Sequence, residues 1–287
     1  MTDGSTLVSV ADLAASLDDP ALRLFDCRAS LADTGAGEAA WRAGHLPGAQ
    51  HAHLEHDLSG PHAPGAGRHP WPQADAFAAW LGRAGVTPAS RVVAYDAGDG
   101  AFAARLWWLL RSFGHARVAV LDGGLAAWTA AGLPLAVAAP AIDHVTDPAA
   151  PYPGRFAGER LLDAAAVAAR VAAGDLLIDA RGSERFRGEV EPIDRVAGHV
   201  PGARSRPYPL NLRDGRFRPA AELAAEFDAL LAGRAPSAAI AMCGSGVTAC
   251  HHLLAMAHAG RDGAALFTGS WSGWIEDPAR PVATGDA

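Results

Sequence analysis

The sequence predicts an α/β protein of two tandem domains, each built from a mostly parallel β-sheet with helices on both faces. Three observations support this fold class. Short apolar segments of strand length alternate with segments whose apolar residues recur at helical spacing. The same series of strands, turns and closing motifs occurs twice along the 287 residues. A proline-rich stretch with little periodicity separates the two series.

The first copy contains three strand-like segments, each followed by a polar or glycine-containing motif. A Gly-His-Leu-Pro-Gly-Ala turn, residues 44–49, follows the first segment, and a helix is expected through Trp107 and Leu110 before the third. The segments with their closing motifs are Leu22–Phe25 with Asp26-Cys27-Arg28, Val92–Tyr95 with Asp96, and Val118–Leu121 with Asp122-Gly123-Gly124.

The second copy repeats this order. A Gly-His-Val-Pro-Gly-Ala turn, residues 198–203, again follows the first strand-like segment. Because His45 and His199 lie in both turns, we expect them to hold turns together by hydrogen bonds rather than to take part in catalysis. The segments with their closing motifs are Leu176–Ile178 with Asp179-Ala180-Arg181, Ala238–Met242 with Cys243, and Ala265–Phe267 with Thr268-Gly269-Ser270.

The domain boundaries follow from the repeat and from the prolines between its copies. We expect a first domain over residues 1–135, a linker over 136–158 and a second domain over 159–287. Prolines spaced every few residues predict an extended, semi-rigid linker.

Cys243 is the strongest candidate for a reactive side chain. It ends an apolar strand and is followed by the small residues Gly244-Ser245-Gly246, after which a helix is expected from Val247 with Thr248 or Ser245 as its N-cap. Backbone N–H groups in such a loop point inward at the positive end of a helix dipole. Because this nest stabilises anions, we expect Cys243 to be a thiolate nucleophile.

The first copy carries Asp96 where the second carries Cys243. A carboxylate cannot attack as a thiolate does, and it would fill an anion-binding nest itself. We therefore expect the first domain to keep the architecture and to lack the nucleophile.

Composition excludes several classes of protein. The charge of 24 Lys+Arg against 31 Asp+Glu, a net −7, argues against nucleic acid and anionic membranes as main partners. No apolar run approaches the roughly 20 residues that span a bilayer, and no leader sequence is evident, so a soluble cytoplasmic protein is expected. Three cysteines without a CxxC motif indicate neither a disulfide framework nor a zinc ribbon. The histidines at 51, 53 and 56 lack the acid or cysteine spacing of a metal site, so no metal is expected.

The doubled GHxPGA turn, Asp96 in place of a cysteine, and the loop Cys243-Gly244-Ser245-Gly246-Val247-Thr248 resemble the two-domain rhodanese family of sulfurtransferases. The resemblance covers about residues 7–280 and implies two tandem rhodanese-like domains. Within the family, a C-G-S-G-V-T loop is similar to the 3-mercaptopyruvate type, whereas C-R-K-G-V-T marks the thiosulfate type.

The resemblance implies ping-pong transfer of sulfur through a persulfide on Cys243, held by N–H groups from Gly244, Gly246, Val247 and Thr248. The donor would be 3-mercaptopyruvate, or thiosulfate as the alternative. The acceptor would be cyanide or a thiol such as thioredoxin. No cofactor is implied.

Two arginines are candidates for binding the donor's anionic group. Arg185 matches the family's donor-binding arginine, since a guanidinium fork suits a carboxylate or sulfonate. Enzymes of the mercaptopyruvate type carry a second arginine after a Glu-Pro pair. Here that position holds Ile193, and Arg195 lies two residues later. Either Arg195 reaches the donor or a single arginine binds it.

The resemblance also implies a relay of Ser245, His69 and Glu55 that polarises the donor or protonates the leaving group. Histidine is the natural proton carrier near neutral pH. Glu55 stands where the family often has aspartate.

Two other function classes compete with this assignment. Cysteine phosphatases use a similar cradle with a C-x5-R loop, but the arginine position here is Ala249. A non-catalytic rhodanese-like binding module is the second alternative, which the intact Cys243 loop disfavours.

Overall fold

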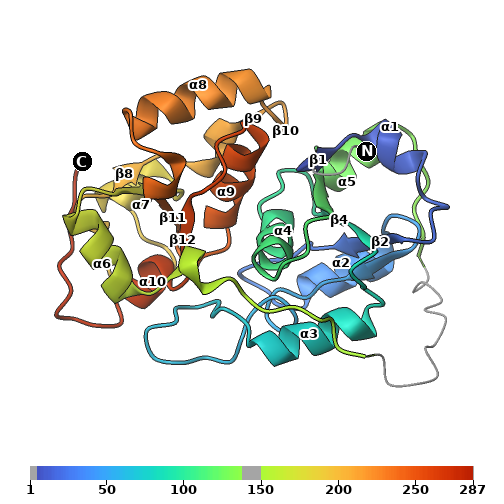
Figure 1. Ribbon diagram of the computed structural model, residues 1–287, viewed down its shortest axis with the longest axis horizontal. Helices are drawn as coiled ribbons and strands as arrows, with labels where there is room; N and C mark the ends of the chain where they lie inside the picture. The colour runs from blue at the N-terminus through green and yellow to red at the C-terminus, as the bar shows by residue number, and fades with distance from the viewer. Residues whose placement is uncertain (1–4, 138–149, 287) are drawn as a thin grey trace. The chain divides into compact units, whose positions relative to one another are not determined.

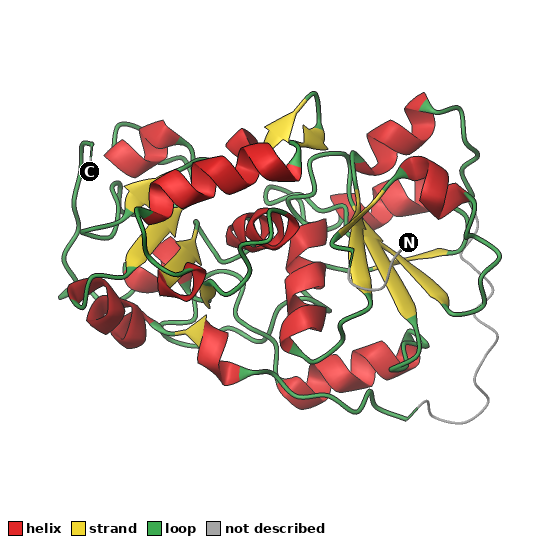
Figure 2. Cartoon of the chain, turned by 45° about the horizontal axis from the view of Figure 1, so that its top comes forward, coloured by secondary structure: helices red, strands yellow, loops and turns green. Residues whose placement is uncertain are grey.

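The computed structural model of the chain describes residues 5–137 and 150–286, which form two compact units (Figure 1). The first unit comprises the chain up to Gly60 together with Pro72–Ala157. The second comprises Pro61–Trp71 together with the chain from Gly158 onward. Each unit has one five-stranded sheet with helices around it, so the predicted fold class is confirmed (Figure 2).

The sheet of the first unit is parallel throughout and has the order β1-β5-β4-β2-β3. Its strands are β1 (Leu7–Val8), β2 (Leu22–Asp26), β3 (Ala49–His51), β4 (Arg91–Tyr95) and β5 (Val118–Leu121). Its helices are α1 (Val10–Ala14), α2 (Ala36–Ala43), α3 (Ala74–Arg83), α4 (Ala103–Ser112) and α5 (Gly124–Ala130).

Both faces of this sheet are buried, which explains why its strands are continuous apolar runs. Leu24 of β2 packs in a cluster with Leu13 of α1 and Trp128 of α5. The next residue, Phe25, points to the opposite face, because side chains alternate along a strand. Its ring lies 5.3 Å from that of Trp80 on α3.

The second unit repeats this topology with the order β6-β12-β11-β7-β8, again parallel. A small antiparallel pair, β9 (Leu212–Arg213) with β10 (Arg216–Phe217), is added to it. The sheet strands are β6 (Leu161–Leu162), β7 (Leu176–Asp179), β8 (Arg204–Ser205), β11 (Ala239–Met242) and β12 (Ala265–Phe267). The helices are α6 (Ala164–Ala172), α7 (Ser183–Arg187), α8 (Ala220–Leu231), α9 (Ala249–His258) and α10 (Ser270–Trp274), with short 3-10 turns η1 (Gly158–Arg160), η2 (Tyr208–Asn211) and η3 (Pro236–Ala238).

The two GHxPGA turns are held in the same way in both units. Nδ1–H of His45 donates to the carbonyl of Trp41, and Nδ1–H of His199 donates to the carbonyl of Phe186, each over 2.8 Å. Both histidines are buried, and each forms an isolated backbone bridge to a residue much later in its own unit. These contacts agree with the structural role expected for the two residues.

The chain passes between the units at different places from those the sequence suggested. Residues 61–71 belong to the second unit although they lie far inside the range predicted for the first domain. Of the predicted linker 136–158, residues 138–149 lie outside the described residues, and the stretch that follows packs on the first unit. There the amide of Tyr152 donates to the carbonyl of Ala78, and Ala157 donates to that of Ser112.

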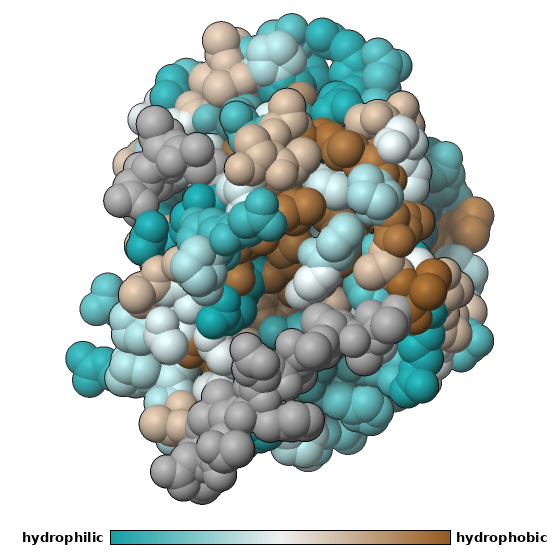
Figure 3. All heavy atoms as spheres, turned by 90° about the vertical axis from the view of Figure 1, so that its right-hand side faces the viewer, coloured by the Kyte–Doolittle hydropathy of each residue, from teal (hydrophilic) through white to brown (hydrophobic). Residues whose placement is uncertain are grey.

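The surface of the first unit mixes polar and apolar side chains. The face in Figure 3 is largely hydrophilic with hydrophobic patches between. The exposed large hydrophobic side chains of this unit include Leu31, Leu135 and Val137. Over the described ranges, no helix combines the length and the apolar character needed to cross a bilayer. A cytoplasmic location stays a prediction.

Candidate active site

Cys243 lies directly after β11, at the carboxyl end of the parallel sheet, where functional residues of such sheets gather. The residue is 1% exposed. The amide of Gly246 donates to the Cys243 sulfur over 3.2 Å, so one N–H of the predicted cradle points at the sulfur. Gly246 has φ +78°, a left-handed conformation that favours glycine.

The strand, loop and helix predicted around Cys243 are all present, but the helix begins later than expected. Helix α9 starts at Ala249 rather than Val247. Thr248 occupies the N-cap position without a capping hydrogen bond from its side chain. Ser245 lies before the N-cap position, and its hydroxyl contacts His69.

Ser270 fixes the backbone of Cys243 from the neighbouring strand end. Its hydroxyl accepts a hydrogen bond from the Cys243 amide over 3.1 Å and donates to the carbonyl of Phe267 over 3.0 Å. The residue has φ +48°, which is strained for a side chain other than glycine. The first unit has Gly124, with φ +52°, at the corresponding place, where a Cβ would lie 2.6 Å from the Asp96 carbonyl oxygen.

His69 reaches the Cys243 loop from the segment 61–71. Its Nδ1 and the Ser245 hydroxyl are 2.7 Å apart, and both residues are 4% exposed. The structure therefore brings together the two predicted relay members that lie in the second unit.

Helix α10 and Glu276, the second residue after it, hold the segment 61–71 in place. Glu276 accepts hydrogen bonds from the amides of Gly65 and Gly67, and the Ser272 hydroxyl accepts one from the Arg68 amide over 3.0 Å. Gly67 has φ +76°, and a Cβ at this position would collide with the carbonyl of Gly269. This close approach allows the next two residues to face the Cys243 loop.

Arg185, on α7 after β7, also lies beside the loop. A Cβ placed on Gly244 would stand 3.7 Å from both Nη atoms of Arg185. The guanidinium donates to Glu191 over 2.7 and 3.1 Å and to Asp194 over 3.2 Å. Although burial of Glu191 opposes its ionisation, the hydrogen bonds from Arg185 and from nearby amides hold the pKa of Glu191 below its ordinary value.

Arg68 is a functional candidate that the sequence analysis missed. Its Nη1 donates to the Asp194 carboxylate, and its Nη2 would lie 2.9 Å from a Cβ on Gly244. The feature of the sequence that could have indicated Arg68 is its position next to His69, in a Gly-Arg-His-Pro stretch. Burial raises the pKa of Asp194, with the charges of Arg68 and Arg185 acting in the opposite direction.

Arg195, the other predicted donor ligand, donates to the carbonyl of Ile275. Ile193 is 44% exposed, and its amide donates to Glu191 over 3.1 Å.

Glu55, the third predicted relay member, belongs to the first unit. It follows β3 and is half-buried, and its amide donates to Nδ1 of His53 over 3.1 Å. Its part in a relay stays a prediction.

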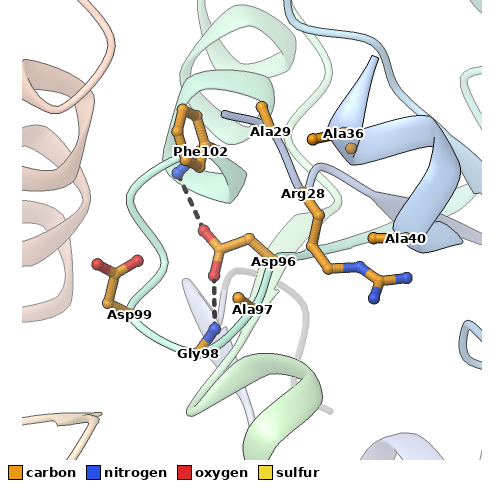
Figure 4. A pocket seen from close by; sticks show the side chains of 10 residues that line it. Arg28, Ala29, Ala36, Ala40, Asp96, Ala97, Gly98, Asp99 and Phe102 are labelled. Carbon is orange, nitrogen blue, oxygen red and sulfur yellow. Dashed lines mark hydrogen bonds between the residues drawn. The ribbon is translucent and has the colours of Figure 1, made fainter. Parts of the chain in front are cut away.

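In the first unit, Asp96 occupies the nest that corresponds to the Cys243 loop. One carboxylate oxygen accepts from the amides of Gly98 and Gly100 over 3.1 and 3.0 Å, and the other accepts from Phe102 and Ala103 over 2.9 and 3.1 Å. Figure 4 shows the carboxylate turned into this loop. As expected, the side chain fills the nest itself.

A cavity of about 580 Å³ lies beside Asp96 at the same end of the sheet (Figure 4). Most of its lining is alanine and glycine, with Phe102, Arg28 and Asp99. Burial, and next the charge of Asp99, raise the pKa of Asp96, against the effect of the amides that bind it.

Within residues 5–137 and 150–286, no three His, Cys, Asp or Glu side chains are grouped so as to hold a metal ion. His53 and His56 stack on one another with ring centroids 4.2 Å apart.

Comparisons with known proteins agree with this architecture. The rhodanese-like domain family matches residues 9–131 and again 163–277. The chain is 48% identical to the Pseudomonas aeruginosa protein named "Probable 3-mercaptopyruvate sulfurtransferase", with 98% of each chain covered. It is 41% identical to the Mycobacterium tuberculosis protein named "Putative thiosulfate sulfurtransferase SseB", with 99% of each covered.

Among solved structures, the 3-mercaptopyruvate sulfurtransferase SseA of Escherichia coli superposes with a TM-score of 0.76 at 33% identity. The match covers 93% of this chain and 99% of that one. With both of its α/β units matched and these relatives matched over nearly their whole length, the chain belongs to the rhodanese-like family and contains two rhodanese-like domains.

Proposed function

We propose that this protein is a sulfurtransferase that moves a sulfur atom from 3-mercaptopyruvate to a thiol or to cyanide through a persulfide on Cys243. The observation that carries the proposal is the position of the Cys243 sulfur. It accepts a hydrogen bond from Gly246 in a loop whose Ser245 is bonded to His69. Relatives named as sulfurtransferases over nearly the whole chain support the same reaction class.

In the first half-reaction the Cys243 thiolate attacks the sulfur of 3-mercaptopyruvate. A sulfur–sulfur bond forms, the carbon–sulfur bond breaks, and its electron pair leaves with the carbon as the enolate of pyruvate. The enolate then takes up one proton to become pyruvate. The inward amide of Gly246, with the predicted N–H groups of Gly244, Val247 and Thr248, would stabilise the terminal sulfur that remains.

Ser245 and His69 are suited to deliver that proton. Histidine exchanges protons near neutral pH, and its hydrogen bond to Ser245 over 2.7 Å places a hydroxyl next to the nucleophile's loop. We propose that this pair protonates the enolate and that Glu55 completes the relay.

In the second half-reaction an acceptor attacks the outer sulfur of the persulfide. A thiol acceptor such as that of thioredoxin becomes a persulfide and cyanide becomes thiocyanate, while the electron pair of the sulfur–sulfur bond returns to Cys243. The nest of the first domain, which Asp96 fills, would form no persulfide.

Thiosulfate is the second candidate donor, favoured by the name of the M. tuberculosis relative. Attack on its outer sulfur would release sulfite and leave the same persulfide. The loop sequence at residues 243–248 favours 3-mercaptopyruvate instead, because it lacks the two extra cations of the thiosulfate type.

The test is a side-by-side assay of pyruvate release from 3-mercaptopyruvate and thiocyanate formation from thiosulfate plus cyanide. We expect 3-mercaptopyruvate to be the better donor and both activities to vanish in Cys243→Ser. A thiosulfate preference of about tenfold, equal to about 1.4 kcal/mol, would overturn the choice of donor. A wild type inactive with both donors would favour the remaining alternative, a binding module without catalysis.

A further inference from the structure

We propose that Arg68 supplies a second guanidinium to the donor's anion subsite beside Cys243, next to Arg185, the arginine to which the family resemblance already gives that role. Arg68 would add a donor-binding residue to the proposed sulfurtransferase site, and the identity of the donor rests on that proposed function. Arg68 would then be a residue that determines donor specificity, a role for which Arg195 was a candidate from the sequence.

Nitrogen atoms of both guanidinium groups lie close to Gly244 in the active loop. A Cβ placed on Gly244, the residue after Cys243, would lie 2.9 Å from Nη2 of Arg68 and 3.7 Å from Nη1 of Arg185. Because residue 244 has no side chain, the two guanidinium groups can approach the backbone next to the nucleophile. A group bound between them would therefore lie beside the sulfur.

Nη2 of Arg68 and Nη1 of Arg185 have no hydrogen-bond acceptor within the described part of the chain. Arg68 uses Nη1 for Asp194, and Arg185 uses Nε and Nη2 for Glu191 and Asp194. That leaves Nη2 of Arg68 and Nη1 of Arg185 to face Gly244. Their side chains are 29% and 19% exposed, so a small anion from solvent can reach both.

Asp194 sets the spacing of the pair. Its two carboxylate oxygens accept from different arginines, Oδ1 from Arg68 and Oδ2 from Arg185, and its side chain is 5% exposed. A buried carboxylate shared in this way holds both guanidinium groups before a ligand arrives, which lowers the entropy cost of binding. Two cations at a fixed separation suit a planar carboxylate or a sulfonate-like group.

Three other arginines of the second unit have hydrogen-bond partners of their own, and none of their atoms is among those nearest to a Cβ on Gly244. Arg195 donates to the carbonyl of Ile275, and Arg187 pairs with Glu189 at the surface. The Arg181 side chain is 1% exposed and donates to both carboxylate oxygens of Asp179.

The subsite is tested by alkylating Cys243 with iodoacetate, an anion, and with iodoacetamide, its uncharged counterpart. Peptide mass spectrometry follows Cys243 separately from Cys27 and Cys250. The measured quantity is the rate constant for iodoacetate divided by that for iodoacetamide. Changes in thiol reactivity or loop order affect both reagents and therefore cancel in this ratio. The variants are Arg68→Met and Arg185→Met, with Arg195→Met as the rival and Arg187→Met as the matched surface control.

We expect Arg68→Met and Arg185→Met each to lower the iodoacetate-to-iodoacetamide ratio by about tenfold, and Arg195→Met and Arg187→Met to leave it within twofold of wild type. Arg68→Lys should lie between, because lysine keeps the charge and loses the fork. A ratio unchanged in Arg68→Met, or lowered as strongly in Arg195→Met, would overturn the inference.

The same measurement separates this inference from the proposed function. If wild type formed no persulfide with either donor but its alkylation ratio depended on Arg68, the anion subsite would stand and the sulfurtransferase assignment would fall. If the wild type transferred sulfur normally and Arg68→Met kept both its alkylation ratio and its KM for 3-mercaptopyruvate, only the subsite would fall.

Discussion

His69 and Ser245, which lie 176 residues apart in the sequence, are joined by a buried hydrogen bond of 2.7 Å between Nδ1 and the hydroxyl. The contact lies within one unit, because residues 61–71 pack with the second sheet. It places the His69 imidazole against a hydroxyl of the Cys243 loop, and the proposed function gives this pair the transfer of a proton to the leaving carbanion.

This pair predicts that the two donors respond differently to loss of the imidazole. In His69→Gln we expect turnover with 3-mercaptopyruvate to fall by about 10²-fold or more, because its leaving enolate must be protonated. Turnover with thiosulfate should fall by less than about tenfold, because sulfite leaves as a stable anion. Steady-state assays with both donors make the comparison.

The exposed His62, in the same segment, supplies the control, and His62→Gln should match wild type with both donors. Ser245→Ala should reproduce the loss caused by His69→Gln, and the double variant should lose no more, since the two residues act as one unit. Equal losses with both donors would show that the pair does not serve the leaving group.

From the contacts and backbone of Ser270 we expect wild type to be the most stable protein, Ser270→Gly to be less stable and Ser270→Ala the least stable. Removing its hydroxyl in Ser270→Ala leaves the Cys243 amide and the Phe267 carbonyl without their partner, which should lower the free energy of unfolding by about 1–3 kcal/mol. Ser270→Gly loses the same hydrogen bonds but relieves the strain of φ +48°, so it should retain about 1 kcal/mol more than the alanine variant. Denaturant unfolding measures both, and an alanine variant as stable as the glycine variant would contradict the strain argument.

The lowered pKa of Glu191 implies that the stability of the fold depends on pH in the acid range. Its pKa in the folded protein lies below the ordinary 4.5, so its ionised form stabilises the fold above pH 4.5, and that contribution is lost as the pH falls through the folded value. We expect Glu191→Gln to be less stable than wild type at pH 7 and the difference to shrink steadily below pH 4.5. Unfolding measured across this pH range tests the trend.

Glu189 is the matched surface acid for that comparison. It pairs with Arg187, but its side chain is 54% exposed, so solvent screens the pair. Glu189→Gln should therefore change stability little at any pH. A gap between Glu191→Gln and wild type that stayed constant down to strongly acid pH would show that Glu191 acts by packing rather than by charge.

Asp96 predicts a variant that weakens the first unit and spares catalysis. Asn at this position offers one acceptor oxygen to a loop in which two oxygens bind four amides, so Asp96→Asn should lower stability by about 2 kcal/mol or more. Hydrogen exchange at Gly98, Gly100, Phe102 and Ala103 should speed up, while persulfide formation at Cys243 should not change. Lost sulfur transfer in a protein that is still folded would give the Asp96 nest a chemical role.

Much of the fold could be predicted because its signals are local. The predicted strand Val118–Leu121 is observed with the same bounds, and Val92–Tyr95 is one residue short, because strands buried on both faces are continuous apolar runs. The edge strands β1 and β6 have two residues each, too few for any periodicity, and the sequence analysis missed them.

The parts of the site that could not be predicted depend on packing between distant segments. His69 carried a motif and was recognised, whereas its neighbour Arg68 became a candidate only once Gly67 was seen against Gly269. Arg195 was a candidate for donor binding from its place in the sequence; its Nη2 donates to the carbonyl of Ile275, and its role in donor binding stays a prediction. Helix α9 begins at Ala249 with Thr248 at its N-cap position, whereas Ser245, the other N-cap candidate, is hydrogen-bonded to His69.

The most direct test of the central claim is mass spectrometry of Cys243 after adding 3-mercaptopyruvate without any acceptor. We expect a mass increase of about 32 Da, one sulfur atom, on the peptide that contains Cys243, with release of one equivalent of pyruvate. Treatment with cyanide should remove the added mass. Pyruvate released at the wild-type rate by Cys243→Ser, or released by wild type with no sulfur left on Cys243, would contradict it.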